Sequence, residues 1–128
     1  MNEKAKYWID LSDYDFETAI AMMQTGRYLY VGFMCHQTIE KILKAYFSEF
    51  NSETVPFTHS LSYLAKKSDI YNRLPEEMKN FIDILEPLNI EARYPSYKER
   101  LMKSLTKERC QSILDNTKLL KIWITERL

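Results

Sequence analysis

The side chains best suited to chemistry near neutral pH are two histidines and a short arginine-containing segment. His36 and His59 are the chain's two histidines, and imidazole is the side chain that exchanges a proton most readily at physiological pH. Arg93 opens a segment in which Tyr97 and Lys98 follow four and five positions later. Aromatic faces beside cationic side chains suit stacking on unpaired RNA bases. The alternative for such tyrosines is local packing and hydrogen bonding at the edge of a helical bundle.

Each histidine also has a structural interpretation, which we favour. His36 lies in a helical run beside Cys35, where a boundary residue bonded to a neighbouring helix is expected more often than a base that reaches Arg93. His59 precedes a short apolar run, so a capping or helix-positioning role is the better interpretation. The spacing of the two histidines assembles no metal site, and we expect no metal and no cofactor. Cys35 and Cys110 are isolated thiols and are expected to be buried in a reducing compartment.

Three charged residues, Glu40, Lys41 and Lys44, fall within one helical run. Glu40 and Lys44 are spaced i,i+4 in the favourable orientation, which predicts a solvated ion pair on the outer side of the helix, worth about 0.3 kcal/mol. In the alternative arrangement, Lys41, Lys44 and Arg93 line a phosphate-attracting groove between subunits, and Glu40 orients Arg93. Spacing alone does not favour that alternative. The mixed charges from Lys98 to Arg109 predict a solvated face.

Composition predicts one all-α domain over residues 1–128. Gly and Pro number only 2 and 4, too few for a sandwich or barrel with its frequent turns. Eighteen basic and eighteen acidic side chains give a formal net charge of zero, which lacks the strongly basic footprint typical of nucleic-acid binding and favours self-association. No apolar stretch has the length of a signal segment or a membrane span, so we expect a cytoplasmic protein without membrane contact.

Apolar periodicity predicts an antiparallel, up-and-down bundle of four main helices plus a short fifth one. The first helix is expected from about Glu3 to Thr25 and ends at Gly26, which enters the left-handed region without steric cost. The second is expected from Arg27 or Tyr28 to Phe50, so the connection is short and forces an antiparallel hairpin.

The remaining helices are expected after a loop. Thr58 is predicted to cap a short helix, Pro75 to open the next one and Pro87 to end it. The segment from Asn89 to Leu105 has the least regular pattern, with Pro95 holding Tyr94 out of helical geometry. Thr106 is then expected to cap the last helix.

Four pieces of the sequence occur in the order that HEPN domains (higher eukaryote and prokaryote nucleotide-binding) show. They are Thr25-Gly-Arg-Tyr28, the run from Val31 to Ala45 that includes Gln37 and Glu40-Lys41, Thr58-His-Ser-Leu61, and Ala92-Arg-Tyr-Pro95. A tryptophan and the acidic stretch Asp10-Leu-Ser-Asp13 in the first helix fit the same pattern. The chain thus resembles a small, stand-alone prokaryotic HEPN domain over nearly its whole length.

This resemblance implies a homodimer that binds nucleotides or RNA. It also implies a possible partner, a separately encoded minimal nucleotidyltransferase, as in toxin–antitoxin pairs. Apolar residues outside the main stripe of the second helix add an argument for dimerisation: Phe33, Met34, Ile42 and Phe47. Because the resemblance favours the intersubunit groove, the candidate nucleotide- or RNA-binding residues are Arg93, Tyr97, Lys98, Lys41, Lys44, Glu40 and His36.

Many HEPN domains are metal-independent ribonucleases whose motif is an Arg, a polar residue, a short spacer and a His. Arg93 matches the motif Arg, but Tyr94 replaces the polar residue and no His follows as far as Thr106. Lysine and tyrosine ordinarily titrate near 10, so Lys98 and Tyr97 are weak substitutes for the missing His. We therefore expect a nucleotide- or RNA-binding module in which catalysis is degenerate or absent. The alternatives are an active toxin-type ribonuclease that uses Arg93 and a purely structural protein-interaction module.

Overall fold

A computed structural model describes the backbone of residues 1–128 and every side chain except those of Glu91 and Pro95. The described residues form helices and no strand, which confirms the predicted all-α class. In chain order the helices are α1 (Glu3–Gln24), α2 (Tyr28–Phe50), α3 (Leu61–Lys67), the 3-10 turn η1 (Tyr71–Arg73), α4 (Glu76–Leu85), α5 (Leu88–Glu91), α6 (Pro95–Ser104) and α7 (Lys107–Thr125). The count therefore differs from four main helices plus one.

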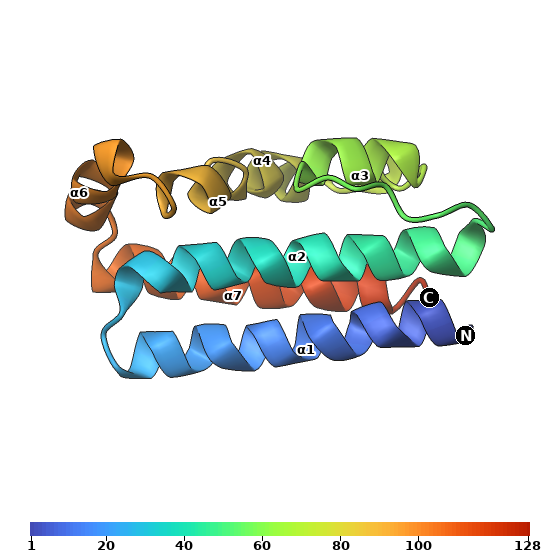
Figure 1. Cartoon of the computed structure of the whole chain (residues 1–128), viewed down its shortest axis with the longest axis horizontal. Coiled ribbons are helices and arrows are strands. Elements are labelled where there is room, and N and C mark those ends of the chain that lie inside the picture. Colours follow the sequence, from blue (N-terminus) through green and yellow to red (C-terminus); the bar gives the residue numbers. More distant parts are fainter.

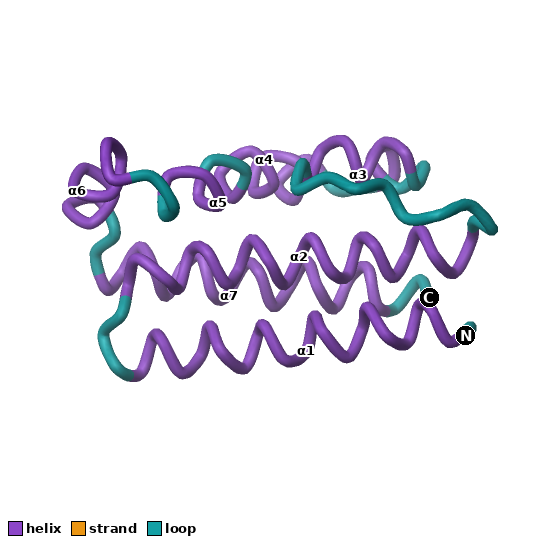
Figure 2. Tube along the Cα trace, viewed as in Figure 1, coloured by secondary structure: helices purple, strands orange, loops and turns teal.

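Three long helices, α1, α2 and α7, lie side by side, and the shorter helices α3 to α6 form a row along the other side of α2 (Figure 1). The loop before α3 turns back from the end of α2 and runs along this row (Figure 2). Among the described residues, none of the helices is long and apolar enough to cross a bilayer.

The first two helices form the predicted antiparallel hairpin. Gly26 has φ of +72°, in the left-handed region that favours glycine. The Arg27 N–H donates to the carbonyl of Met22 at 2.8 Å, so the chain reverses within three residues. The turn places the start of α2 beside the end of α1 and fixes the register of the hairpin.

Helix α2 is central because it packs against α1, α7 and the row of short helices. Fifteen of its 23 residues are buried, so the rest of the chain covers most of the helix. Ile42 and Phe47 are fully buried, and Phe33 and Met34 pack partly buried against the same core. The argument that these four side chains form a dimer surface is therefore wrong for Ile42 and Phe47, which the chain covers itself, whereas Phe33 and Met34 keep part of their surface exposed.

Helix α5 approaches α2 closely at Gly32. A Cβ atom built on Gly32 would lie 2.9 Å from Cδ1 of Leu88, a buried residue of α5. The short helix can pack this tightly because glycine carries no side chain. This contact sets the position of α5 and therefore of the segment that leads into α6.

Capping and proline signals in the sequence predicted some helix ends correctly and others incorrectly. Thr106 caps α7 by accepting from the Arg109 N–H at 3.2 Å, as predicted. Thr58 does not cap α3; Ser60 does, accepting from the Tyr63 N–H. The segment predicted to be irregular contains the ten-residue helix α6, which begins at Pro95 after an extended Tyr94. Proline suits a first helical position because its missing N–H would have no partner there.

Both cysteines are buried, as predicted from their isolated positions. Burial raises the pKa of the Cys35 thiol to about 12 and that of Cys110 to about 11. A thiol is a nucleophile only as the thiolate. These cysteines therefore act as small core residues.

Candidate functional site

The segment that carries Arg93 forms an exposed corner at one end of the row of short helices. Tyr94 has extended backbone geometry (φ −109°, ψ 125°), and its carbonyl accepts the N–H groups of Tyr97 and Lys98 at 3.0 and 3.1 Å. The chain therefore turns sharply into α6. We call the resulting surface the α6 corner and define it by five exposed residues: Arg93, Tyr94, Tyr97, Lys98 and Arg100.

Cationic and aromatic groups are stacked at the α6 corner. The guanidinium of Arg93 lies over the ring of Phe33 on α2, 5.2 Å from its centroid, and that of Arg100 lies over the ring of Tyr97 at 5.4 Å. Tyr94 and Tyr97 are 55% and 41% exposed. Such contacts hold the arginines beside aromatic rings, and the exposed surface of the two tyrosines suits a planar ligand.

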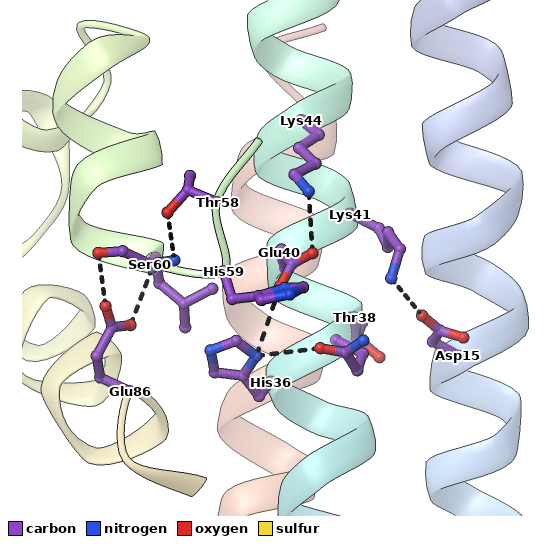
Figure 3. A network of polar contacts seen from close by, with 12 residues as sticks. Asp15, His36, Thr38, Glu40, Lys41, Lys44, Thr58, His59, Ser60 and Glu86 are labelled. Carbon is purple, nitrogen blue, oxygen red and sulfur yellow. Dashed lines mark hydrogen bonds and ion pairs between the residues drawn. The ribbon is translucent and has the colours of Figure 1, made fainter. Parts of the chain in front are cut away.

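The other predicted site residues gather elsewhere, around a buried carboxylate. Oε1 of Glu40 is 2.9 Å from Nδ1 of His59 and 4.0 Å from Nδ1 of His36, and Oε2 accepts from Nζ of Lys44 at 3.0 Å. We call these four residues the Glu40 cluster. Figure 3 shows the ring of His59 lying across Glu40, where the loop before α3 crosses α2.

The Glu40–Lys44 pair forms as predicted, but its predicted place on a solvated face is wrong. Both residues are buried, because α1 and the loop that carries His59 cover this side of α2. Nζ of Lys44 also lies 5.2 Å from the ring centroid of Trp8 on α1. Burial alone would raise the pKa of Glu40, but the His59 hydrogen bond and the Lys44 charge outweigh it and hold that pKa below its usual value.

The side chain of His36 is buried inside the protein. Burial lowers its pKa from 6.5 to about 4, although the charge of Glu40 acts in the opposite direction. The side chain is therefore neutral at physiological pH. Its polar neighbours, Gln37 and Glu40, belong to its own helix and not to a neighbouring one.

Lys41 is also engaged within the chain, since its Nζ lies 3.3 Å from Oδ2 of Asp15 on α1 (Figure 3). Lys41, Lys44 and Arg93 do not share one groove within the chain, because each has a different set of partners. Nor is Arg93 among the partners of Glu40. The structure thus separates the seven candidate residues into the α6 corner and a region around the Glu40 cluster.

The family comparison agrees with the order of these elements along the chain. The HEPN domain model matches residues 5–128, which is nearly the whole chain. The chain belongs to the HEPN domain family. The crystal structure of TT1696 from Thermus thermophilus has a similar fold, with a TM-score of 0.84 at 19% identity over 99% of this chain and 100% of that one. No curated protein matches the chain.

Within this HEPN domain, Arg93 occupies the exposed end of the α5–α6 turn, and the neighbouring side chains offer no imidazole. His36 and His59 both approach Glu40 instead. Phe33, whose ring lies under Arg93, and Glu40 are seven positions apart on α2, a rise of about 10 Å. The α6 corner therefore has groups for stacking and for binding anions, whereas the Glu40 cluster holds the chain's histidines.

His59 was not among the predicted site residues, yet it is the exposed member of the Glu40 cluster, with a side chain 53% exposed. The Thr58-His-Ser-Leu61 match was the signal that could have identified it. Its neighbour Ser60 donates to Oε1 of Glu86, the residue directly after α4, at 2.8 Å, and the Leu61 N–H donates to Oε2 at 2.9 Å. These contacts fix the chain directly after His59, so the described geometry gives this HEPN motif a structural role.

No group of three or more His, Cys, Asp or Glu side chains is arranged to hold a metal ion among the residues whose side chains are described.

Proposed function

We propose that this HEPN domain is a nucleotide- or RNA-binding module that binds through the α6 corner and performs no catalysis of its own. The observation that carries the proposal is the exposed set of stacked arginines and tyrosines at the position of the family's motif Arg. Metal-free RNA cleavage needs a group that takes the 2′-hydroxyl proton and one that protonates the leaving oxygen. The α6 corner supplies neither as an imidazole.

The chemistry of the α6 corner suits single-stranded RNA or a free nucleotide. Tyrosine faces stack on bases with little dependence on sequence, and arginine contributes both charge and a planar surface. Each stacked base is worth about 1–3 kcal/mol. Lys98, on the same helix, adds a further positive charge.

The working form that we propose is a homodimer, paired with a separately encoded minimal nucleotidyltransferase in a prokaryotic toxin–antitoxin arrangement. The support is the family membership and the zero net charge, which favours association. Light scattering at micromolar protein is expected to give twice the chain mass of 15.3 kDa. A monomeric mass would contradict the dimer.

The experiment that tests the proposal measures binding and cleavage together. Fluorescently labelled single-stranded RNA is titrated with the protein in the presence of a chelator, and the same RNA is examined for cleavage. We expect binding without cleavage, and binding at least tenfold weaker for Arg93→Ala. Lys103→Ala is the matched control, because this exposed α6 lysine is paired with Glu99 at 3.8 Å.

An active ribonuclease is the second candidate, because Arg93 keeps the motif position. Cleavage that persists in chelator and disappears in Arg93→Ala would establish it and overturn the binding-only proposal. If neither RNA nor nucleotide binds the wild-type protein, the remaining candidate is a protein-interaction module.

A further inference from the structure

A second feature of the α6 end is an open hollow of about 420 Å³ between α6 and the α1–α2 turn. Both elements lie at the same end of the molecule in Figure 1. The hollow is lined by Thr25, Gly26, Arg27, Tyr28, Leu29 and Tyr30 from the turn and the start of α2, and by Lys98 and Met102 from α6. None of the residues proposed as site residues from the sequence comes from the turn, so this hollow adds new groups to Lys98.

Among the residues whose side chains are described, the charged groups of the hollow are all positive. Arg27 and Lys98 line it from two different elements, and no acidic side chain of that part of the chain lines it. Within the part of the chain whose side chains are described, neither cation takes part in an ion pair, whereas Lys41, Lys44 and Lys103 each do. Two cations facing one cavity favour an anionic ligand.

The hollow also offers aromatic and apolar surface. Tyr30 is 43% exposed and Met102 is 57% exposed, while Tyr28 is half-buried and its carbonyl lies 3.6 Å from Sγ of Cys110. A tyrosine face beside cationic side chains suits a base attached to a phosphate. A thioether adapts its shape to such a ring.

We infer that this hollow is a mononucleotide site in which Arg27 and Lys98 hold the phosphate and Tyr30 stacks on the base. The inference rests on the proposed function and narrows it, because the cavity lies within the size range of small-ligand sites, about 300–1,000 Å³. A free mononucleotide is the ligand that we infer, because the two cations face one hollow and can hold one phosphate group between them.

The same helix carries a hollow that serves as an internal control. It has about 460 Å³ and is lined by Ser96, Glu99, Arg100 and Lys103. There the carboxylate of Glu99 lies 3.8 Å from Nζ of Lys103. This hollow resembles the first in size, but it contains an acidic group and no aromatic lining residue. It should not hold a nucleotide phosphate.

The test measures binding to the full chain by isothermal titration calorimetry, with adenosine 5′-monophosphate, adenosine and inorganic phosphate as probes. Arg27→Gln and Lys98→Gln remove one cation each at exposed positions, and Lys103→Gln removes the control cation. We expect adenosine 5′-monophosphate to bind the wild type more tightly than either fragment does. Each of Arg27→Gln and Lys98→Gln should weaken it about tenfold, the usual loss for one charge-assisted phosphate contact.

Tyr30→Leu should weaken adenosine 5′-monophosphate and adenosine alike, leaving phosphate binding unchanged. Equal binding by the wild type, Arg27→Gln and Lys98→Gln would overturn the mononucleotide site, although the proposed function would stand. Binding of single-stranded RNA without binding of the mononucleotide would likewise overturn the site and leave the α6 corner as an RNA surface. If neither ligand binds, both proposals fail. Circular dichroism of each variant checks that a lost signal is not lost folding.

Discussion

The Glu40 cluster and the α6 corner contain similar residue types in opposite settings. In the Glu40 cluster, the charges of Glu40 and Lys44 are buried and paired at 3.0 Å, and Glu40 also contacts the half-exposed His59 at 2.9 Å. At the α6 corner, the arginines are exposed and lie over aromatic rings, with Arg93 on Phe33 and Arg100 on Tyr97. Both regions contact the same helix, α2, about two turns apart.

Because of this difference, we expect the Glu40 cluster to contribute to stability and the α6 corner to contribute to binding. Charges that are buried and paired contribute to the folded state and are not available to a ligand, since their hydrogen-bonding groups are already occupied. Exposed cations on aromatic rings contribute little to stability. Their charge and planar groups therefore remain available to a ligand. We therefore expect substitutions in the Glu40 cluster to act on unfolding, and substitutions at the α6 corner to act on ligand binding.

The largest effect is expected from Glu40→Ala. The change leaves the ammonium of Lys44 buried without its partner and releases His59 and its loop from α2. Removing one partner of a buried ion pair typically costs about 3–5 kcal/mol. Urea unfolding monitored by circular dichroism should show a loss of that order in the free energy of unfolding.

Glu99→Ala is the control for this first substitution. Glu99 also pairs with a lysine four residues away, but its side chain and that of Lys103 are 85% and 78% exposed. An exposed pair of this kind contributes almost nothing. If Glu40→Ala were no more destabilising than Glu99→Ala, burial would not be the property that distinguishes the two regions.

Acid is expected to act through His36 in the Glu40 cluster. Burial lowers the folded-state pKa of His36 from 6.5 to about 4, so the unfolded chain binds the proton first and stability falls as pH decreases through this window. The full difference corresponds to roughly 3 kcal/mol. Urea midpoints measured between pH 7.5 and 4.5 should therefore decrease steadily toward acid.

His36→Gln removes the titrating group and isolates its contribution. The variant should lose much less stability over the same pH range than the wild type. Parallel pH profiles would show that His36 does not cause the acid sensitivity, and that another group of the chain does.

The sequence predicted the long helices well because their signals are local. Gly26 and Thr106 mark ends that depend on neighbouring backbone atoms alone. The Glu40 cluster was misplaced on a solvated face because His59 reaches Glu40 from nineteen residues away. An i,i+4 pattern does not indicate which loop will cover a helix. Burial of the Glu40–Lys44 pair is therefore a tertiary property.

The α6 corner was only partly predictable for a related reason. Arg93 was recognised from its motif, but its stacking partner Phe33 lies sixty residues earlier. Helix α6 itself was missed because its apolar face consists of few residues, Leu101 among them, within a highly charged segment. Arg27 and Tyr30 were not connected with Lys98, since their proximity depends on how α6 packs against the α1–α2 turn.

A smaller effect is expected from Gly32→Val, which tests whether the two regions are coupled through α5. The added side chain meets Leu88 where even a Cβ would lie 2.9 Å from Cδ1. Overpacking of this kind costs about 1–3 kcal/mol. It should also displace α5 and weaken RNA binding at the α6 corner. Stability and RNA affinity that change together would mark α5 as the link between the regions, and an unchanged affinity would show that they are independent.

The smallest effect on stability is expected from Arg93→Ala. Its stacking on Phe33 is exposed, and cation–π contacts at exposed sites are worth about 0.5–1 kcal/mol. Urea unfolding should therefore shift by less than about 1 kcal/mol, although RNA binding falls at least tenfold. Glu40→Ala should give the reverse pattern, with a large loss of stability and unchanged RNA binding when binding is measured under fully folded conditions. The two variants together therefore test directly whether stability and binding depend on different regions. A large loss of stability in Arg93→Ala would mean that the α6 corner also holds the fold together, and its effect on binding could then no longer be assigned to ligand contact.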